Sequence, residues 1–355
     1  MIKKIFILLL LGIPLISSGC LEDEPIFTEY FDINESAELL IYLESKGDYI
    51  NNTWTFSMVE APDVYATINS NLIIDVRSNE DFVLGHIEGA VNLESNELLD
   101  YILGTDHQNY HMIVIVSSTG QSSLYYTTLL RLYGLSNVYS LQWGIASWNP
   151  FFYGNWLDVI QDPAGPNHLS KFNDIWYEKG ESRPLPLLEF LPASYTIESM
   201  LEERIRFLFN EVFSEETDKE FVGSTSMGLY PLLDDYNSEA DSYSNYYPVC
   251  MINEDLYLPE HPPGTILFKS LMPFSHFKSS QFLQTLPVDK IISLYGYNGQ
   301  YSAAFTAYLR ILGYDARSIL YGYHRISYGR LLAYPVFEDY RFDASKLNNL
   351  PIIVD

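Results

Sequence analysis

The sequence predicts an α/β protein with two similar domains, each a parallel sheet flanked by helices. Three observations lead to this fold class. The chain has 355 residues, and domains usually run to about 100–200 residues, so two domains are expected. Buried-strand patterns alternate with helix patterns, which is typical of a parallel sheet covered on both faces. The later half of the chain also repeats the order and spacing of the earlier half.

The alternation is clearest from residue 72 to residue 141. The segment 72–93, "LIIDVRSNEDFVLGHIEGAVNL", begins with a buried-strand pattern and continues into a turn and a short helix. A second buried strand, "HMIVIV" at 111–116, leads through a loop into the helix pattern of 122–134. That helix is expected to end at Gly134, and "NVYSL" at 137–141 predicts the next strand.

A weaker copy of this layout follows from residue 249. In the first copy, His86 stands 11 positions after Asp75, and Gly89 follows three positions later. In the second copy, Cys250, His261 and Gly264 have the same two spacings. The tripeptide "TGQ" at 119–121 matches "NGQ" at 298–300, and "LRLYG" at 130–134 matches "LRILG" at 309–313. This shared order indicates two copies of one α/β unit.

The motifs of the first copy resemble those of the rhodanese (thiosulfate sulfurtransferase) family, in which tandem copies are common. The resemblance lies in D-V-R, then G-H-I-x-G-A-x-N, then a strand ending in a six-residue loop. It spans roughly residues 72–148, where "WGIASW" resembles the closing motif of the family, and more faintly residues 247–326. The second copy departs from the pattern, because Cys250 replaces the aspartate and "HPPGTI" replaces "HIEGAV".

The resemblance and the composition together give a domain division. We assign a rhodanese-like domain to residues 31–155 and a degenerate one to residues 195–355. Between them, residues 156–194 are rich in proline and aromatic residues and are predicted to form an irregular linker.

Three further segments have readable patterns. Residues 36–50 and 196–213 have helical apolar periodicity and are predicted to be amphipathic helices that lead into the two domains. Residues 234–247 are predicted to form an exposed acidic loop.

Neither predicted loop carries the cysteine that sulfur transfer requires. In the family, a loop thiolate takes up a sulfane sulfur as a persulfide, and the loop N–H groups stabilise the thiolate. The resemblance places Ser117 and Gly296 at the two cysteine positions. A serine hydroxyl stays protonated near neutral pH without a base, so the resemblance implies that no catalytic residue for sulfur transfer is present in either loop.

The backbone cradle of each loop remains a candidate site for a small anion or for the carboxylate of a partner. The alternative is that these loops only join strand to helix, and a hydrolase based on Ser117 would need a base from elsewhere in the fold. Tyr297 and Tyr301 are expected to close the second loop. The candidate residues are Ser117, Ser118, Thr119, Gly120, Gln121 and Ser122 in the first loop and Gly296, Tyr297, Asn298, Gly299, Gln300 and Tyr301 in the second.

The other residues of the motifs are expected to hold the fold rather than to react. The resemblance makes the two histidines anchors of tight turns and makes the aspartate and the arginine fold-holding groups. Cys250, at the end of a predicted strand, is expected to be buried and inert. The structural set is Asp75, Arg77, His86, Gly89, His261 and Gly264.

The N-terminus predicts export and lipidation. Residues 1–19 have two lysines, a short apolar run and small residues, the three-part form of a secretory signal. The apolar run is shorter than the ~20 residues of a membrane span. The ending "SSGC" resembles the lipobox of bacterial lipoproteins, which implies lipidation at Cys20 and an anchored tether over residues 20–30. Ordinary secretion with cleavage nearby is the alternative.

The net charge and the absence of metal and haem motifs limit the classes of partner and cofactor that we expect. A formal net charge of −26 repels phosphate backbones, so nucleic acid is not expected. No zinc, haem or HExxH motif is present, so we expect neither a metal nor another cofactor. The sequence predicts a catalytically inactive binding or assembly protein, lipid-anchored at the outer membrane or cell surface, with a protein partner in the envelope. The alternative is an enzyme that transfers sulfur or handles sulfur or selenium oxyanions through another group.

Overall fold

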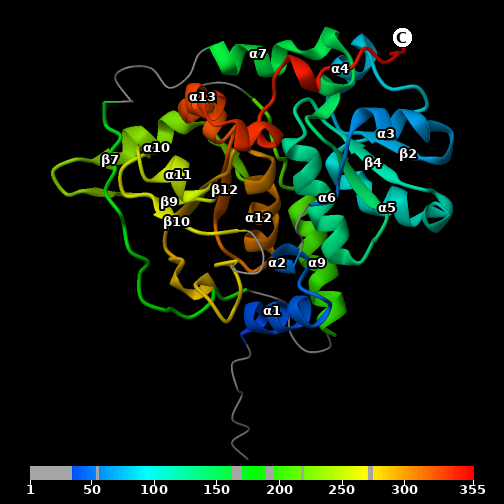
Figure 1. Ribbon diagram of the computed structural model, residues 1–355. Helices are drawn as coiled ribbons and strands as arrows, with labels where there is room; N and C mark the ends of the chain where they lie inside the picture. The colour runs from blue at the N-terminus through cyan, green and yellow to red at the C-terminus, as the bar shows by residue number, and fades with distance from the viewer. Residues whose placement is uncertain (1–33, 53–55, 162–169, 189–195, 217–219, 271–274) are drawn as a thin grey trace, which may run out of the picture. The chain divides into compact units, whose positions relative to one another are not determined.

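The computed structural model describes residues 34–52, 56–161, 170–188, 196–216, 220–270 and 275–355 (Figure 1). All of them belong to one compact unit, Asn34–Asp355. This unit contains two five-stranded parallel sheets and one two-stranded hairpin, and helices flank the sheets, which confirms the predicted fold class. The predicted signal peptide, Cys20 and the tether lie outside the described residues.

The first sheet has the strand order β1-β5-β4-β2-β3. Its strands are β1 (Met58–Val59), β2 (Leu72–Asp75), β3 (Val91–Asn92), β4 (Ile113–Val116) and β5 (Val138–Leu141). Its helices are α3 (Ala61–Ala66), α4 (Asn79–Leu84), α5 (Leu98–Leu103), α6 (Gln121–Tyr133), η1 (Ile68–Ser70), η2 (Ser95–Glu97), η3 (His107–Asn109) and η4 (Gly144–Ser147). Every residue of β2 and β4 is buried, as expected for central strands covered on both faces.

The second sheet has the strand order β10-β9-β11-β12-β6. Its strands are β6 (Ser226–Met227), β9 (Tyr246–Cys250), β10 (Ile266–Leu267), β11 (Ile291–Tyr295) and β12 (Ala316–Ile319). Its helices are α10 (Leu229–Asp235), α11 (Glu254–Tyr257), α12 (Gln300–Ile311), α13 (Tyr323–Ala333), η6 (Leu283–Thr285), η7 (Pro335–Tyr340) and η8 (Ala344–Lys346). Numbered along the chain and read from the β6 edge, its strands follow the order of the first sheet. We call residues 58–147, from β1 to η4, the first repeat, and residues 226–342, from β6 through η7 to Phe342, the second repeat.

The core lies between the two sheets and continues beyond each of them. Alternate strand residues face opposite ways, so Ile74 and Ile115 point into a central cluster while Ile73 and Val114 point into a cluster on the far face of the first sheet. The central cluster also contains residues of the second sheet, and a third cluster covers the far face of that sheet. Helices α6 and α12 pack against each other within the central cluster (Figure 1).

The two predicted amphipathic helices are present. The first pattern forms α1 (Glu35–Ser45) and α2 (Tyr49–Asn52), and the second forms α9 (Ile197–Phe209). Helix α9 begins after Thr196, whose hydroxyl accepts a hydrogen bond from the Ser199 N–H.

The expected acidic loop at 234–247 is partly ordered as a hairpin. It consists of β7 (Tyr236–Asn237) and β8 (Ser242–Tyr243). Tyr243 is buried, and its hydroxyl donates to the Pro263 carbonyl at 2.7 Å, so an aromatic anchor overrides the polar composition of the segment.

The predicted irregular linker, residues 156–194, starts within a helix instead. Residues Gly154–Gln161 form α7, and the short helix η5 (Pro150–Phe152) comes just before it. Trp156 of α7 is fully buried, and its ring centroid lies 5.2 Å from that of Tyr321 and 5.1 Å from that of Phe342. Burial of this indole against the second repeat stabilises a helix that the proline and aromatic composition conceals.

Candidate functional site

The first candidate loop joins β4 to α6. Gly120 has φ 86°, and a Cβ atom there would overlap the Gln300 side chain and crowd the backbone N–H of Trp143, so only glycine fits. The Ser117 hydroxyl oxygen accepts from the Gly120 N–H at 3.0 Å and closes the turn. This geometry leaves the N–H groups of Thr119 and Ser122 free to bind a ligand at the start of α6.

A carboxylate from the same chain occupies this cradle. Glu215 lies in the segment after α9, and its Oε2 accepts from the Thr119 N–H at 2.8 Å. Its Oε1 accepts from the Ser122 N–H at 2.7 Å and from the Ser122 and Ser117 hydroxyls, both at 2.9 Å. Glu215 and Ser117 are 98 positions apart, so nothing in the local sequence of the loop points to this contact.

The contact between Ser117 and Glu215 also decides what the loop can do chemically. A hydroxyl that donates to a carboxylate has the arrangement of a nucleophile and its base. Here, however, the same carboxylate takes up both backbone N–H groups that an oxyanion would need. As it stands, the N–H groups of Thr119 and Ser122 bind this carboxylate rather than a reaction intermediate.

Asp75 and Arg77 pair with each other beside this loop. The guanidinium of Arg77 contacts the Asp75 carboxylate at 2.6 Å, and both side chains are almost wholly buried. Arg77 Nη2 also donates to the Gly85 carbonyl at 2.8 Å, which fixes the turn that precedes His86. The pair is therefore internal to the fold, and the guanidinium is not free to hold a substrate.

The two motif histidines have matching structural surroundings. His86 stacks on Phe82 and His261 stacks on Tyr257, with ring centroids 3.9 Å apart in both cases. The Nδ1 atom of each histidine lies next to the carbonyl of that same aromatic residue, at 3.1 Å and 2.8 Å. The glycine three positions later has positive φ in both repeats, 77° at Gly89 and 67° at Gly264.

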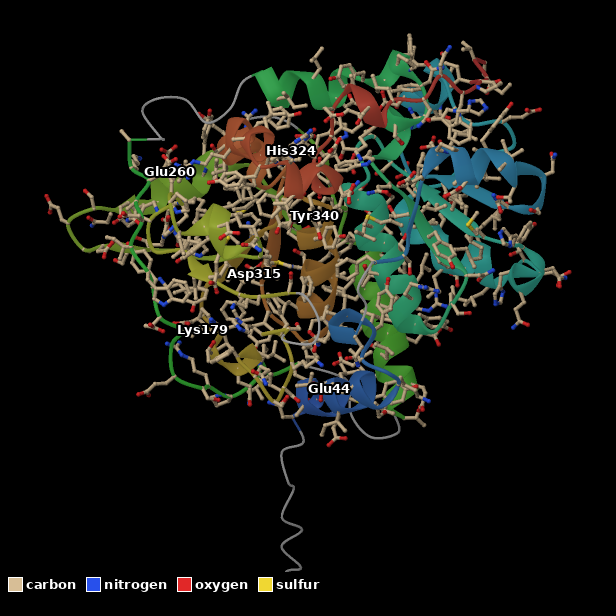
Figure 2. All side chains as sticks on the ribbon, in the orientation of Figure 1. Glu44, Lys179, Glu260, Asp315, His324 and Tyr340 are labelled. Atoms are coloured by element: carbon tan, nitrogen blue, oxygen red, sulfur yellow. The ribbon has the colours of Figure 1, made fainter. Side chains whose placement is uncertain are left out.

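The second candidate loop joins β11 to α12 and is filled by its own side chains. Asn298 Oδ1 accepts from the Gln300 N–H at 3.0 Å, and its amide donates to the Tyr340 carbonyl at 3.2 Å, so both polar atoms of this side chain are bonded within the chain. The ring of Tyr297 is buried and stacks on Tyr340 of η7, with centroids 4.3 Å apart (Tyr340 is labelled in Figure 2). Gly296 contributes no side chain, and its carbonyl accepts from the Tyr323 N–H at 2.8 Å.

The glutamines of "TGQ" and "NGQ" cross between the repeats. Gln121 Oε1 accepts from the Tyr321 N–H at 2.8 Å, and Gln300 Nε2 donates to the Thr119 carbonyl at 3.2 Å. Each glutamine therefore reaches the other repeat rather than a ligand in its own loop. Their side chains tie the two loops together across the α6–α12 contact.

Cys250 belongs to neither candidate loop. It lies at the end of β9 opposite Tyr295, as Asp75 lies at the end of β2 opposite Val116. Its thiol is buried, and burial raises its pKa to about 12. Such a thiol is protonated at neutral pH and does not react as a thiolate.

The described ranges contain neither a metal-binding cluster nor a membrane-spanning helix. No group of three or more His, Cys, Asp and Glu side chains in them is placed to hold a metal ion. No helix among the described residues combines the length and the apolar character of a membrane span.

Comparison with known proteins places the first repeat in a family. A model of the rhodanese-like domain matches residues 60–150. A thiosulfate sulfurtransferase GlpE of Ectopseudomonas mendocina (strain ymp) is 35% identical over 85 residues, which cover 24% of this chain and 75% of that protein. The chain belongs to the rhodanese-like family.

A further relative and a solved structure are also similar to this chain. The thiosulfate sulfurtransferase GlpE of Stutzerimonas stutzeri (strain A1501) is 31% identical over 94 residues, 26% of this chain and 84% of that protein. A crystal structure of a thiosulfate sulfurtransferase from Pseudomonas aeruginosa matches 81% of this chain and 46% of its own, at 13% identity and a TM-score of 0.28.

Proposed function

We propose that this rhodanese-like protein does not transfer sulfur and acts as a binding or assembly component of a cell-envelope complex. In this proposal a lipid on Cys20 anchors it outside the cytoplasm, at the outer membrane or cell surface, and both repeats serve as a rigid platform for a protein partner. The observation that carries the proposal is the Glu215 carboxylate bound in the first cradle.

The electrostatics of the first cradle support the absence of sulfur transfer. A loop that stabilises a thiolate or a sulfur oxyanion needs its N–H donors free, and here they bind an anion of the same chain. A second anion beside the Glu215 carboxylate would be repelled. In the second loop, Gly296 supplies no nucleophile and the buried Tyr297 ring stacks on Tyr340.

A sulfurtransferase assay tests the inactivity directly. The chain from residue 21 onward is assayed for thiosulfate:cyanide sulfur transfer beside its Cys250→Ala variant. We expect no turnover above that of the variant, because the buried Cys250 thiol is protonated at neutral pH. Turnover above the variant would overturn the proposal and favour the enzyme alternative.

A second experiment asks whether Glu215 keeps the first cradle closed to anionic chemistry. Ser117→Cys is made alone and together with Glu215→Gln, and the thiol pKa is read from the pH dependence of alkylation. The free N–H donors should bring the thiol of the double variant below the ordinary value of about 8.5, whereas the carboxylate should hold the single variant above it. Ser117→Cys with Glu216→Gln is the matched control, and equal pKa values in all three would contradict this role of Glu215.

The lipid anchor is tested by intact mass. The protein purified from membranes should carry diacyl modification on Cys20, and Cys20→Ala should release it from the membrane fraction. A cleaved and unmodified N-terminus would refute the anchor. Loss of a co-purifying envelope protein in Cys20→Ala, with its retention in the unaltered chain, would support the assembly role.

A further inference from the structure

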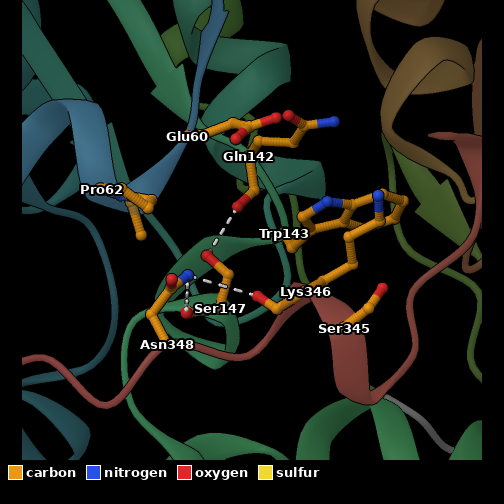
Figure 3. Close-up of a pocket in the computed structure, with 9 residues that line it drawn as sticks. Glu60, Pro62, Gln142, Trp143, Ser147, Ser345, Lys346 and Asn348 are labelled. Atoms are coloured by element: carbon orange, nitrogen blue, oxygen red, sulfur yellow. Dashed lines mark hydrogen bonds between the residues drawn. The ribbon is translucent and has the colours of Figure 1, made fainter.

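A small pocket of about 140 Å³ lies where three segments of the chain meet (Figure 3). Glu60, Ala61 and Pro62 contribute from the start of α3, and Gln142, Trp143 and Ser147 from the segment after β5. Ser345, Lys346 and Asn348 contribute from the C-terminal segment that follows the second repeat. The pocket is distinct from both loops, and none of its residues belongs to the predicted site.

The C-terminal wall of the pocket is fixed in place. Asp343 Oδ1 accepts from the N–H and the hydroxyl of Ser345, at 2.8 Å and 2.6 Å, and caps η8. The N–H and the side-chain amide of Asn348 both donate to the Ser147 carbonyl at 3.0 Å. The Ser147 hydroxyl in turn donates to the Gln142 carbonyl at 2.8 Å (Figure 3). A pocket whose walls are bonded to each other is pre-formed for a ligand.

Four side chains of the lining have polar groups that this framework does not use. The Lys346 side chain, alone among the lysines and arginines of the described ranges, has no hydrogen bond, ion pair or aromatic contact. The Gln142 amide and the Glu60 carboxylate likewise form no hydrogen bond within those ranges. Trp143 is only 3% exposed, yet its indole N–H donates to no described residue.

The unpaired Lys346 ammonium is distinctive among the cations of the described ranges. The chain carries a net charge of −26, so carboxylates are available to almost any cation on its surface. Polar groups of nearly buried side chains are normally hydrogen-bonded. A lysine left unpaired beside a nearly buried indole N–H and a half-buried amide therefore indicates three donors reserved for an external acceptor.

The charges of these groups specify the ligand. Three donors, at Lys346, Gln142 and Trp143, suit a carboxylate. Glu60 suits an ammonium, and Figure 3 shows that its side chain and that of Gln142 extend to the same side of the pocket. A zwitterion satisfies both, and because it is neutral overall the negative field of the protein does not repel it.

We propose that this pocket binds a free α-amino acid with a small side chain. Its carboxylate binds to Lys346, Gln142 and Trp143, and its ammonium binds to Glu60. The volume of about 140 Å³ limits the side chain to a few atoms, for which Ala61 and Pro62 offer an apolar wall. The pocket gives the protein a ligand that the proposed assembly role does not require.

Calorimetric titration of the full-length protein in detergent micelles tests this inference with three probes. L-Alanine carries both charges, acetate carries only the carboxylate, and methylamine carries only the ammonium. We expect saturable binding of alanine and at least tenfold weaker binding of each fragment. Absence of saturable alanine binding would overturn the proposal, and so would acetate binding as tightly as alanine.

Variants localise the binding. Lys346→Met and Glu60→Gln should each weaken alanine binding at least tenfold, whereas Lys278→Met and Glu88→Gln, made at positions outside the pocket, should leave it unchanged. Because Lys346 has no partner within the described ranges, Lys346→Met should retain the thermal midpoint of the parent chain. Alanine binding that survives both pocket variants would overturn the assignment. The sulfurtransferase assay reports on the proposed function alone, so the two proposals can fail separately.

Discussion

The two loops of the molecule share one backbone and contain different occupants. Gly120 and Gly299 have nearly the same φ, 86° and 82°, at the start of α6 and α12. In the first loop a charged side chain from a distant segment, Glu215, fills the cradle. In the second, Asn298 bonds the neighbouring Gln300 N–H, and the Tyr297 ring stacks on Tyr340.

This difference separates what shapes a cradle from what the cradle holds. Two glycines set the path of the backbone in each repeat. One stands at the start of the helix, and the other stands in the turn after β5 or β12. The occupant depends on side chains that the backbone does not specify. Membership of the family therefore predicts the backbone shape of the loop in this protein better than it predicts the chemistry of the loop.

The largest expected effect comes from the turns that follow β5 and β12, which contain Gly144 and Gly322 and where the two repeats should respond alike. A Cβ atom at Gly144 would overlap the Ser117 carbonyl, and one at Gly322 would overlap the Gly296 carbonyl, and both glycines have positive φ. Each alanine substitution should lower the free energy of unfolding by about 4 kcal/mol. Gly134→Ala, where no atom lies within 4 Å, should cost only about 1 kcal/mol in urea unfolding. A mild effect at one turn would show that the two loops differ in backbone as well.

Acid should destabilise the second repeat more than the first, because His261, His276 and His324 in the second repeat all have lowered pKa values. Burial lowers the pKa of His324 to about 4; its Nε2 accepts from the Phe342 N–H at 2.9 Å and its Nδ1 lies 2.7 Å from the Tyr297 carbonyl (Figure 2). An unfolded histidine takes up a proton near pH 6.5, so the stability from neutral His324 is complete above that pH and is lost as the pH falls toward 4.

The expected loss of stability from His324 is about 3 kcal/mol between pH 6.5 and pH 4. Hydrogen exchange at pH 5 should show α13 and β12 opening before α6 and β4. His324→Gln should be less stable than the parent at pH 7.5 and should show a flatter pH dependence. A profile as steep as that of the parent would assign the acid sensitivity to other groups.

Removal of Glu215 should affect the first loop alone. Glu215→Ala deletes an acceptor of four hydrogen bonds, and we expect a loss of about 2 kcal/mol of unfolding free energy because several of these bonds are charge-assisted. Amide exchange at Thr119 and Ser122 should accelerate, while exchange at Gln300 should not change. Glu216→Ala is the control, and equal exchange in both variants would mean that Glu215 does not hold the cradle in solution.

The smallest effect is expected from the local occupant of the second loop. Asn298→Ala removes the acceptor of the Gln300 N–H and the amide that donates to the Tyr340 carbonyl at 3.2 Å. The cost should be about 1 kcal/mol in urea unfolding, as for the loss of a helix cap. A cost greater than that of Glu215→Ala would reverse the ranking of the two occupants.

Local patterns predicted much of this fold for physical reasons. The strands β2 and β4 are continuous apolar runs because helices cover both faces of their sheet, and such runs are visible in the sequence. The matched steps between the aspartate or cysteine, the histidine and the glycine of each repeat reflect matched turns. The helix at 154–161 was missed because its stability comes from Trp156 packing on residues far away in the chain.

The candidate site was less accessible from sequence. The loops are located by their glycines, but the contact of Glu215 joins positions 98 apart, and no periodicity or motif marks that glutamate. The same holds for the pocket at Lys346, whose walls come from three separated segments. Long-range side-chain contacts of this kind depend on the assembled core.

The paired glutamines, Gln121 and Gln300, have a consequence for how such a chain arises. Each side chain lies against the glycine of the opposite loop, Gln121 against Gly299 and Gln300 against Gly120, which is the arrangement of an isologous contact in a two-fold symmetric dimer. Covalent fusion of two such subunits preserves their mutual fit while freeing each half from the requirement to match the other. One half is then free to acquire the Glu215 carboxylate in its loop, and the other half is free to acquire the Tyr297–Tyr340 stack.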